Sequence, residues 1–426
     1  MTRIAAVFAW EALDSRGTPT VACEVELVGG VRAQATVPSG ASTGSHEAME
    51  KRDGGDRYGG RGVLGAVANV NDDIGPMIVG RAIDDPAALD DLVRAHDGSP
   101  NLERLGANAV LAVSVALWRA AAEAEGAPLW RYLCPDEPPL LPMPMVNIIS
   151  GGAHAARAVD FQDFLVIPLG APTFAAAIEW AWRVRRAAAS LIEGMGAPSV
   201  MVADEGGLAA PFDSNEQPMA VISKAIEAAG FRPGDDVAIA IDVAATQLWN
   251  GTGYEMASEA RTISAAGMTA LLTRWADVYP LVSIEDPHAE DDWEGWAGCS
   301  AALNDRLQLI GDDLFCTNVE RLERGIADGS ANAVLVKPNQ IGSLADARRV
   351  LDRAHAAGFA TVVSARSGDT EDDWLADLAV GWRAGQIKVG SLTRSERQAK
   401  WNRLLRIEAQ NPGATFAGRS ALGPRV

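Results

Sequence analysis

Hydrophobic and polar residues alternate over short stretches at the start of the chain. Residues 4–9 and 19–37 show this pattern, which places every second side chain on one face of a strand. Gly29-Gly30 interrupts the second stretch and predicts a turn between two strands. Apolar positions are frequent over residues 108–125, and a glycine and a proline follow where a helix would end. We therefore expect short strands followed by helices in this part of the chain.

Prolines gather in one later segment. Five of them fall within residues 135–144, which favours an extended connector over a regular element. This segment is the best candidate for a domain boundary. We expect one domain over residues 1–134 and a second over residues 135–426. A chain of 426 residues is long enough for two domains, or for one large barrel with an appendage.

Beyond the connector, short apolar runs alternate with helix-length amphipathic or alanine-rich segments, such as residues 173–193 and 344–357. Continuous apolar runs are typical of parallel strands that are covered by helices on both faces. Eight such runs favour a (β/α)8-type barrel. A doubly wound sheet is the alternative, but no GxGxxG motif follows the first run. The runs are residues 164–168, 200–203, 237–241, 281–284, 307–310, 333–336, 360–363 and 386–389.

Ionisable residues follow seven of these runs. In a parallel barrel the carboxyl ends of all strands converge on one face, where catalytic residues lie. A single acid after a strand is usually a helix cap or a solvated loop residue. Scattered caps would not, however, segregate into four acidic groups followed by three basic ones. These groups are Asp204-Glu205, Asp242, Glu285-Asp286, Asp312-Asp313, Lys337, Arg366-Ser367 and Lys388.

The composition narrows the range of partners. Lys and Arg number 37 against 56 Asp and Glu, a net charge of −19, which disfavours nucleic acid and anionic membranes. Four scattered cysteines without a CxxC pair fit reduced thiols in a cytosol. No apolar run reaches the length of a membrane span, and we see no signal peptide. We expect a cytoplasmic protein that acts on a small molecule.

The acidic strand ends suit a hard metal ion. Asp242, Glu285 and Asp312 offer oxygen ligands, which fit Mg²⁺ better than zinc, because zinc prefers His or Cys. Lys337 and Lys388 would face this cluster. A lysine beside a divalent cation is pushed towards its neutral form and can act as a base. The pattern indicates removal of a proton next to a metal-bound carboxylate.

Other groups suit the remaining parts of such a reaction. Glu205 lies on the acidic side and could protonate a leaving hydroxyl, while Arg366-Ser367 suits a phosphate or a carboxylate. The loop Pro38–Gly44 is either a linker or a lid that closes over the site. His154 is either a surface residue or part of the site.

With these features in view, the sequence resembles enolase, phosphopyruvate hydratase, nearly from end to end. The resemblance implies a small N-terminal α+β domain and an enolase-type barrel whose opening strands are irregular, assembled as a homodimer or a higher homo-oligomer. It covers residues 14–20, 38–44, 106–109, 204–207, 283–287, 311–318, 337–342 and 385–388.

The resemblance also implies roles for individual residues. Asp242, Glu285 and Asp312 match the ligands of a first Mg²⁺, and Ser42 matches the lid serine that reaches a second. Lys337 matches the base that takes the C2 proton of the substrate. Enolase-superfamily sites in general use a Lys or His base with one or two Mg²⁺ ions.

The remaining implied roles concern the substrate. Glu205 matches the acid that helps to expel the C3 hydroxyl, and Lys388 matches the lysine beside the substrate carboxylate. Arg366 and Ser367 match the phosphate contacts, and His154 matches a loop histidine that approaches the phosphate.

The chain departs from the family pattern at three positions, and the resemblance implies that the first two lie near the leaving group. Family members read Ser-His-Arg-Ser-Gly where this chain has Ala365 before the arginine. They read Gln-Glu-Phe where this chain has Gln162-Asp163-Phe164. The resemblance implies that Gln162 binds the substrate and that Asp163 is a catalytic carboxylate beside the leaving hydroxyl, one methylene shorter than in the family. They read Asn-Gly-Gly where this chain has Ser150. Displacing a catalytic group by about 1 Å can lower a rate about 100-fold.

Three functions are consistent with this pattern. The first is ordinary enolase, which converts 2-phosphoglycerate to phosphoenolpyruvate in glycolysis. The second is a specialised paralog, a carboxyphosphonoenolpyruvate synthase of phosphonate or phosphinate antibiotic biosynthesis, with weak activity on 2-phosphoglycerate. The third is a non-catalytic binding protein, against which the intact metal ligands and lysines argue.

Overall fold

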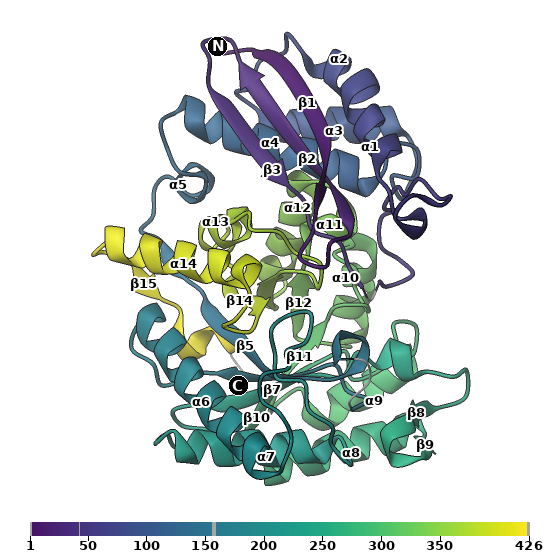
Figure 1. Ribbon diagram of the computed structural model, residues 1–426, viewed down its shortest axis with the longest axis vertical. Coiled ribbons are helices and arrows are strands. Elements are labelled where there is room, and N and C mark those ends of the chain that lie inside the picture. Colours follow the sequence, from purple (N-terminus) through teal and green to yellow (C-terminus); the bar gives the residue numbers. More distant parts are fainter. Residues whose placement is uncertain (1, 42, 156–158, 424–426) are drawn as a thin grey trace.

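The computed structural model describes residues 2–41, 43–155 and 159–423, and it opens with an antiparallel sheet (Figure 1). The Gly30 amide donates to the Leu27 carbonyl at 2.9 Å, and Gly29 and Gly30 both have positive φ angles, so the predicted turn is confirmed. Within residues 2–41 this sheet has three strands: β1 (Ile4–Leu13), β2 (Pro19–Leu27) and β3 (Arg32–Thr36).

Helices cover this small sheet. Helix α4 (Ala107–Ala124) packs against β2 and β3, and its bounds lie within one residue of the predicted helix at 108–125. Gly126, with a φ of 67°, follows its end. The sheet and these helices form the expected α+β unit. Its other helical segments are η1 (Arg57–Gly60), α1 (Leu64–Ala68), the π-helix η2 (Asn69–Ile74), α2 (Gly75–Ile78), α3 (Pro86–Asp97) and α5 (Leu129–Leu133).

The rest of the chain forms a closed barrel. Around the barrel the strands follow the order β10-β11-β12-β13-β14-β5-β6-β7, and β6 runs antiparallel to both of its neighbours, whereas the other pairs are parallel. The opening of the barrel is therefore irregular, as the resemblance implied. In the described residues the eight strands are β5 (Met143–Ser150), β6 (Asp163–Ile167), β7 (Ala238–Asp242), β10 (Leu281–Glu285), β11 (Gln308–Gly311), β12 (Ala333–Val336), β13 (Ala360–Ser364) and β14 (Gly385–Gly390).

Helices surround the barrel (Figure 1). They are α6 (Phe174–Gly194), α7 (Glu216–Ala228), α8 (Ala265–Val278), α9 (Trp293–Leu303), α10 (Val319–Asp328), α11 (Pro338–Ile341), α12 (Leu344–Ala356), α13 (Trp374–Gly381) and α14 (Ser395–Gln410). The smaller elements are β4 (Leu140–Leu141), η3 (Gly152–Ala155), η4 (Ala245–Leu248), β8 (Tyr254–Met256), η5 (Ala257–Glu259), β9 (Arg261–Ile263), β15 (Thr415–Phe416) and η6 (Gly418–Leu422).

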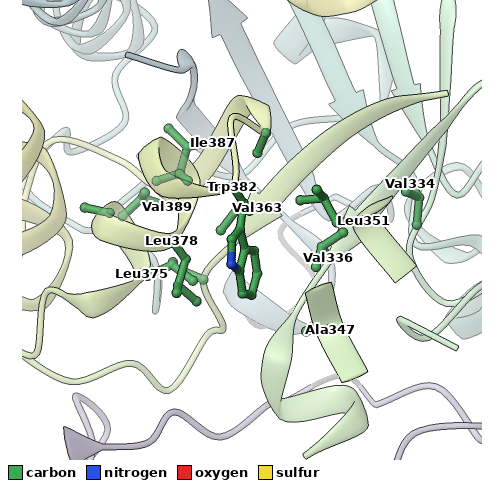
Figure 2. Close-up of a cluster of buried hydrophobic side chains, with 14 of the residues drawn as sticks. Val334, Val336, Ala347, Leu351, Val363, Leu375, Leu378, Trp382, Ile387 and Val389 are labelled. Atoms are coloured by element: carbon green, nitrogen blue, oxygen red, sulfur yellow. The ribbon is translucent and has the colours of Figure 1, made fainter. Parts of the chain in front are cut away.

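The barrel strands are buried on both faces, which explains their continuous apolar sequences. Ala333 and Leu335 of β12 belong to the cluster inside the barrel, whereas Val334 and Val336 belong to the large cluster outside it. Figure 2 shows the outer cluster, where side chains of β12, β13 and β14 meet those of α12 and α13: Val334, Val336, Ala347, Leu351, Val363, Leu375, Leu378, Trp382, Ile387 and Val389.

One of the predicted strands does not form, and one strand of the barrel was not predicted. Residues 200–203 form no strand; Val200 is 86% exposed and Met201 is 59% exposed, so this apolar run lies on the surface of a loop. The eighth barrel strand is instead β5, which begins within the segment that was expected to be a connector. The prolines do not prevent this, because Pro144 is only the second residue of β5, near the start of the strand where a missing amide is tolerated, and the strand still pairs with β14.

The α+β unit rests on the carboxyl-end face of the barrel. The loop after β3 reaches the barrel through two backbone hydrogen bonds between Ser39 and Gly368, at 2.7 and 3.0 Å. The hydroxyl of Ser114 in α4 accepts from the Leu344 amide of α12 at 2.9 Å. The boundary expected between residues 134 and 135 stays a prediction. No helix in the described part of the chain is long and apolar enough to cross a membrane.

Candidate active site

Charged side chains line the face of the barrel where the parallel strands end. Asp242 and Glu285 are the last residues of β7 and β10, and they pair with each other in the strand register. Asp312 and Lys337 come directly after β11 and β12, and Lys388 lies in β14. All five are at most 8% exposed. The structure therefore brings together the strand-end residues that the sequence singled out on this side.

Lys388 joins two of the carboxylates. Its Nζ donates to Asp242 Oδ2 at 2.8 Å and to the two oxygens of Glu285 at 2.8 and 2.7 Å. Burial opposes the charged form, but the two carboxylates raise the pKa of Lys388 well above its usual range. Burial and then the charge of Asp242 raise the pKa of Glu285 well above its usual range. One ammonium therefore does not offset the negative charge that is concentrated here.

Lys337 pairs with the third carboxylate. Its Nζ donates to Asp312 Oδ2, and Gln340 Nε2 donates to Asp312 Oδ1 at 2.9 Å. Although burial opposes it, Asp312 raises the pKa of Lys337. Lys337 is thus a cation in this arrangement. Lys337 can act as the expected base only if another positive group neutralises the Asp312 carboxylate in its place.

The opposite side of the ring is built from β6 and two loops. Because β6 is antiparallel to its neighbours, its first residue, Asp163, lies beside Asp242 at the same face. Asp163 Oδ2 contacts His154 Nδ1 at 3.1 Å, and His154 Nε2 is 4.0 Å from Glu205 Oε1. His154 is buried, so it is not a surface residue. Gln162 donates to Asp242 Oδ2 at 3.1 Å and links the two sides.

Two neutral donors hold the other oxygen of Asp163. Ser150 Oγ donates to Asp163 Oδ1 at 2.9 Å, and Asn147 Nδ2 donates to the same atom. Two of the three departures from the family pattern, at 150 and 163, are therefore in direct contact. A side chain at position 207 would collide with Ser150 Oγ, so Gly207 gives this hydroxyl its space. Burial opposes the charged form of His154, but Asp163 and Glu205 raise its pKa.

Arg366 and Ser367 follow β13, and both contact the loop after β3. Ser367 Oγ accepts from the Ala41 amide at 2.8 Å. Arg366 is 3% exposed and forms a two-pronged ion pair with Glu47. Ala365 is buried and donates its amide to the Lys388 carbonyl at 2.9 Å. Ser42, the expected ligand of a second Mg²⁺, lies outside the described residues.

The predicted metal ligands are only partly gathered. Among the described residues, two groups have possible ligand atoms that all lie within 4.8 Å of one another: His154, Asp163 and Glu205, and Asp286, Asp312 and Asp313. Asp242 and Glu285 meet at Lys388 instead. The three carboxylates of Asp242, Glu285 and Asp312 outnumber the two ammonium groups of Lys337 and Lys388 that they contact. This donor set suits a hard divalent cation such as Mg²⁺.

Three residues that contact the site were not foreseen as site residues. Asn147 is in β5, which the sequence did not predict. Glu47 contacts Arg366, and Gln340 contacts Asp312. Both lie next to motifs that the sequence singles out: Glu47 follows the loop Pro38–Gly44, and Gln340 follows Lys337 by three positions. Proximity to these motifs was the available signal.

A closed β/α barrel with buried ionisable groups at the carboxyl ends of its strands defines a barrel enzyme. The family described as enolase, C-terminal TIM barrel domain, matches residues 138–424, and enolase, N-terminal domain, matches residues 4–133. The chain therefore belongs to the enolase family. It is a lyase of that family and acts on a small molecule; members generally depend on Mg²⁺, and the acidic clusters here could hold a metal ion.

Proposed function

We propose that this protein catalyses an enolase-type dehydration. The substrate is 2-phosphoglycerate or a close phospho- or phosphonoglycerate analogue, which loses its C2 proton and its C3 hydroxyl to give an enolpyruvate product. The observation that carries this proposal is the placement of Lys337 and Asp163. Lys337 directly follows β12 and Asp163 begins β6. These strands are four positions apart in a ring of eight, so the proposed base and the carboxylate of the acid side come from opposite parts of the barrel wall.

This opposition suits an elimination in which the proton and the hydroxyl leave from different faces of the substrate. Lys337 takes the proton at C2. On the other side, Glu205 supplies a proton to the leaving hydroxyl. His154 lies beside Glu205, and although burial opposes its charged form, Asp163 and Glu205 raise its pKa. The Asp163 carboxylate contacts the Nδ1 atom of His154 and so holds the imidazole ring in place.

The phosphate or phosphonate group of the substrate would bind at Arg366 and Ser367. A guanidinium and a hydroxyl are well suited to a phosphate or phosphonate, and Arg366 is buried, which strengthens an ionic contact. Lys388 would lie beside the substrate carboxylate. Gln162, which reaches Asp242, would contact the same substrate.

Asp242, Glu285 and Asp312 would hold a Mg²⁺ ion, and Ser42 is the proposed contact to a second. Mg²⁺ bound there would offset the charge of these carboxylates in place of the lysines and would stabilise the negative charge that develops when the C2 proton leaves. The excess of buried carboxylates over lysines, and the raised pKa of Glu285, support this assignment. We further propose a cytoplasmic homodimer.

The contact between Ser150 and Asp163 favours a second candidate within the same reaction class. Both side chains are shorter than in the family pattern, and a hydrogen bond joins them. The two substitutions on the leaving-group side therefore belong together. Ala365, next to Arg366, lacks the volume of the histidine in the family pattern, which would leave space there for a substrate. A specialised paralog that makes carboxyphosphonoenolpyruvate, whose substrate carries an additional carboxyl group on phosphorus, would use that space.

Turnover with Mg²⁺ on both substrates tests the proposal. The purified protein is assayed with 2-phosphoglycerate and with its carboxyphosphono analogue, beside the double variant Ala365→His/Asp163→Glu. We expect poor kcat on 2-phosphoglycerate and a gain in kcat for the double variant. A kcat in the range of ordinary enolases for the unmodified protein would favour the glycolytic function. Mg²⁺ binding without turnover of either substrate would favour a binding protein.

A further inference from the structure

Glu47 is a buried acid that no role described above uses. It follows the loop Pro38–Gly44, and its side chain is 8% exposed. Its Oε2 accepts from Arg366 Nη1 and its Oε1 from Arg366 Nη2, both at 3.0 Å. Two parallel hydrogen bonds fix the plane of the guanidinium as well as its position. Glu47 therefore sets how Arg366 is presented to the site.

The same carboxylate also ties down the end of the loop. Glu47 Oε1 accepts from the Gly44 amide at 3.1 Å and from Gln340 Nε2 at 3.4 Å. One oxygen thus collects donors from the loop, from Arg366 after β13 and from α11. These three segments are far apart in the sequence.

Gln340 continues this connection into the metal and base side. It is 1% exposed; its Nε2 donates to Asp312 Oδ1 at 2.9 Å, and its Oε1 accepts from Thr317 Oγ1 at 2.7 Å. Thr317 Oγ1 in turn accepts from the Lys337 amide at 2.9 Å. The amide of Gln340 therefore has fixed partners on both of its polar atoms, and it can hold only one orientation of the Asp312 carboxylate.

We propose that Glu47 and Gln340 are positioning residues that couple docking of the loop end to the orientation of Asp312 and Arg366. The inference rests on the proposed function for the roles of Asp312 and Arg366, but the contacts themselves do not. When residues 44–47 are docked, Glu47 presents Arg366 to the substrate anion. Through Gln340 the same contact directs one oxygen of Asp312 away from Lys337.

A simpler account is that Glu47 only neutralises a buried arginine. On that account its loss would lower stability and leave the metal site unchanged, because Arg366 itself is not a metal ligand. Coupling instead requires that a change at Glu47 or at Gln340 alters metal affinity. Mutating partners that orient metal ligands typically lowers metal affinity by about 10- to 100-fold.

The test compares Glu47→Gln and Gln340→Leu with a matched control, Glu50→Gln. Glu50 lies on the same segment but pairs with Arg52 at 2.7 Å and with Ser39 Oγ at 3.1 Å. Calorimetric titration with Mg²⁺ alone measures metal affinity. Hydrogen–deuterium exchange of a peptide that contains Gly44 measures docking of the loop end, and circular dichroism confirms that each variant is folded.

We expect Gln340→Leu to weaken Mg²⁺ binding about 10-fold or more, and Glu47→Gln to weaken it by a smaller factor while speeding exchange at Gly44. Glu50→Gln should change neither. Wild-type affinity in Gln340→Leu, or a Glu47→Gln variant that matches Glu50→Gln in both measurements, would overturn the coupling. Should Glu47→Gln fail to fold, Gln340→Leu decides alone.

These readouts separate the inference from the proposed function. Absence of turnover on every substrate would refute the dehydration, yet the metal titration and the exchange experiment would still report on the coupling. A wild-type protein that binds no Mg²⁺ would overturn the part that concerns Gln340. The exchange rate at Gly44 would then decide the part that concerns Glu47.

Discussion

The two sides of the candidate site are built in different ways. Asp242, Glu285, Asp312, Lys337 and Lys388 stand in or directly after barrel strands, and ammonium groups hold their carboxylates. On the acid side, His154 comes from the short helical turn η3 and Glu205 from a loop, while neutral donors and one imidazole hold Asp163. The first side resembles the family pattern throughout, whereas both changed residues that touch each other lie on the second.

This difference shows where a barrel can change its chemistry. A strand end is fixed by the pairing of the whole barrel, so a residue placed there keeps its position. Loop residues such as Glu205 are less constrained, because no strand pairing fixes them, and Asp163 lies at the end of β6 where it contacts such residues. Substrate choice is therefore expected to change on the acid side, while the metal and the base are retained. The predictions that follow test this contrast from the largest expected effect to the smallest.

Removing Lys337, the proposed base, should have the largest effect. In Lys337→Ala, exchange of the substrate C2 proton with solvent deuterium should fall by about 10²- to 10⁴-fold, because a positioned general base contributes that much. Proton NMR of the substrate in deuterium oxide measures it. Undiminished exchange in this variant would place the base elsewhere in the ring.

Glu205→Gln should separate the two sides. Loss of the C3 hydroxyl should fall by about 100-fold or more, since the leaving group then lacks its acid. Exchange at C2 should survive, because Lys337 and its partner Asp312 are unchanged. Phosphorus NMR follows the product and proton NMR follows the exchange in the same sample. Loss of exchange with dehydration retained would mean that the two roles are reversed.

The contact between Ser150 and Asp163 should appear as a coupling energy. Ser150→Ala removes a hydrogen bond to a carboxylate, and this loss should cost less in an Asp163→Asn background, by about 0.5–3 kcal/mol. Urea unfolding of the single and double variants gives the coupling. Ser364→Ala is the matched control, because that hydroxyl bonds the Ala365 carbonyl and should add independently to Asp163→Asn.

The acid side should also give the smallest effect, a pH dependence of stability. Because the folded-state pKa of His154 is raised, its contribution is fully present below the unfolded-state pKa of about 6.5 and is lost as the pH rises through the folded value. Each unit of pKa difference corresponds to about 1.4 kcal/mol. Thermal unfolding between pH 6 and 9 should show this loss in the wild type and less of it in His154→Gln.

His355 supplies the opposite sign for comparison. Burial lowers its pKa, so the stability linked to His355 is fully present above the unfolded-state pKa of about 6.5 and is lost as the pH falls from there towards the lower folded-state value. His355→Gln should therefore flatten the acidic part of the profile and leave the part above neutrality unchanged. If both variants flatten the same part, the assignment of the His154 contribution is wrong.

Much of the fold could be predicted because the barrel strands have a local signature. Residues 333–336 were predicted as a strand, and β12 has the same bounds, since an apolar run that is buried on both faces needs no partner to be recognised. The same signature failed at residues 200–203, because an apolar run on an exposed loop looks identical. It also missed β5, whose prolines indicated a connector.

The sequence by itself determined that Asp242, Glu285, Asp312 and Lys337 lie at strand ends, because the end of an apolar run is a local property. Glu205 is the exception, because the run before it forms no strand. Only the tertiary structure decided that β6 runs backwards and carries Asp163 to the site, and that Lys388 lies between Asp242 and Glu285. It also decided that Glu47 meets Arg366, 319 positions further along the chain. These contacts depend on strand direction and on packing between distant segments, and no local pattern of residues encodes either.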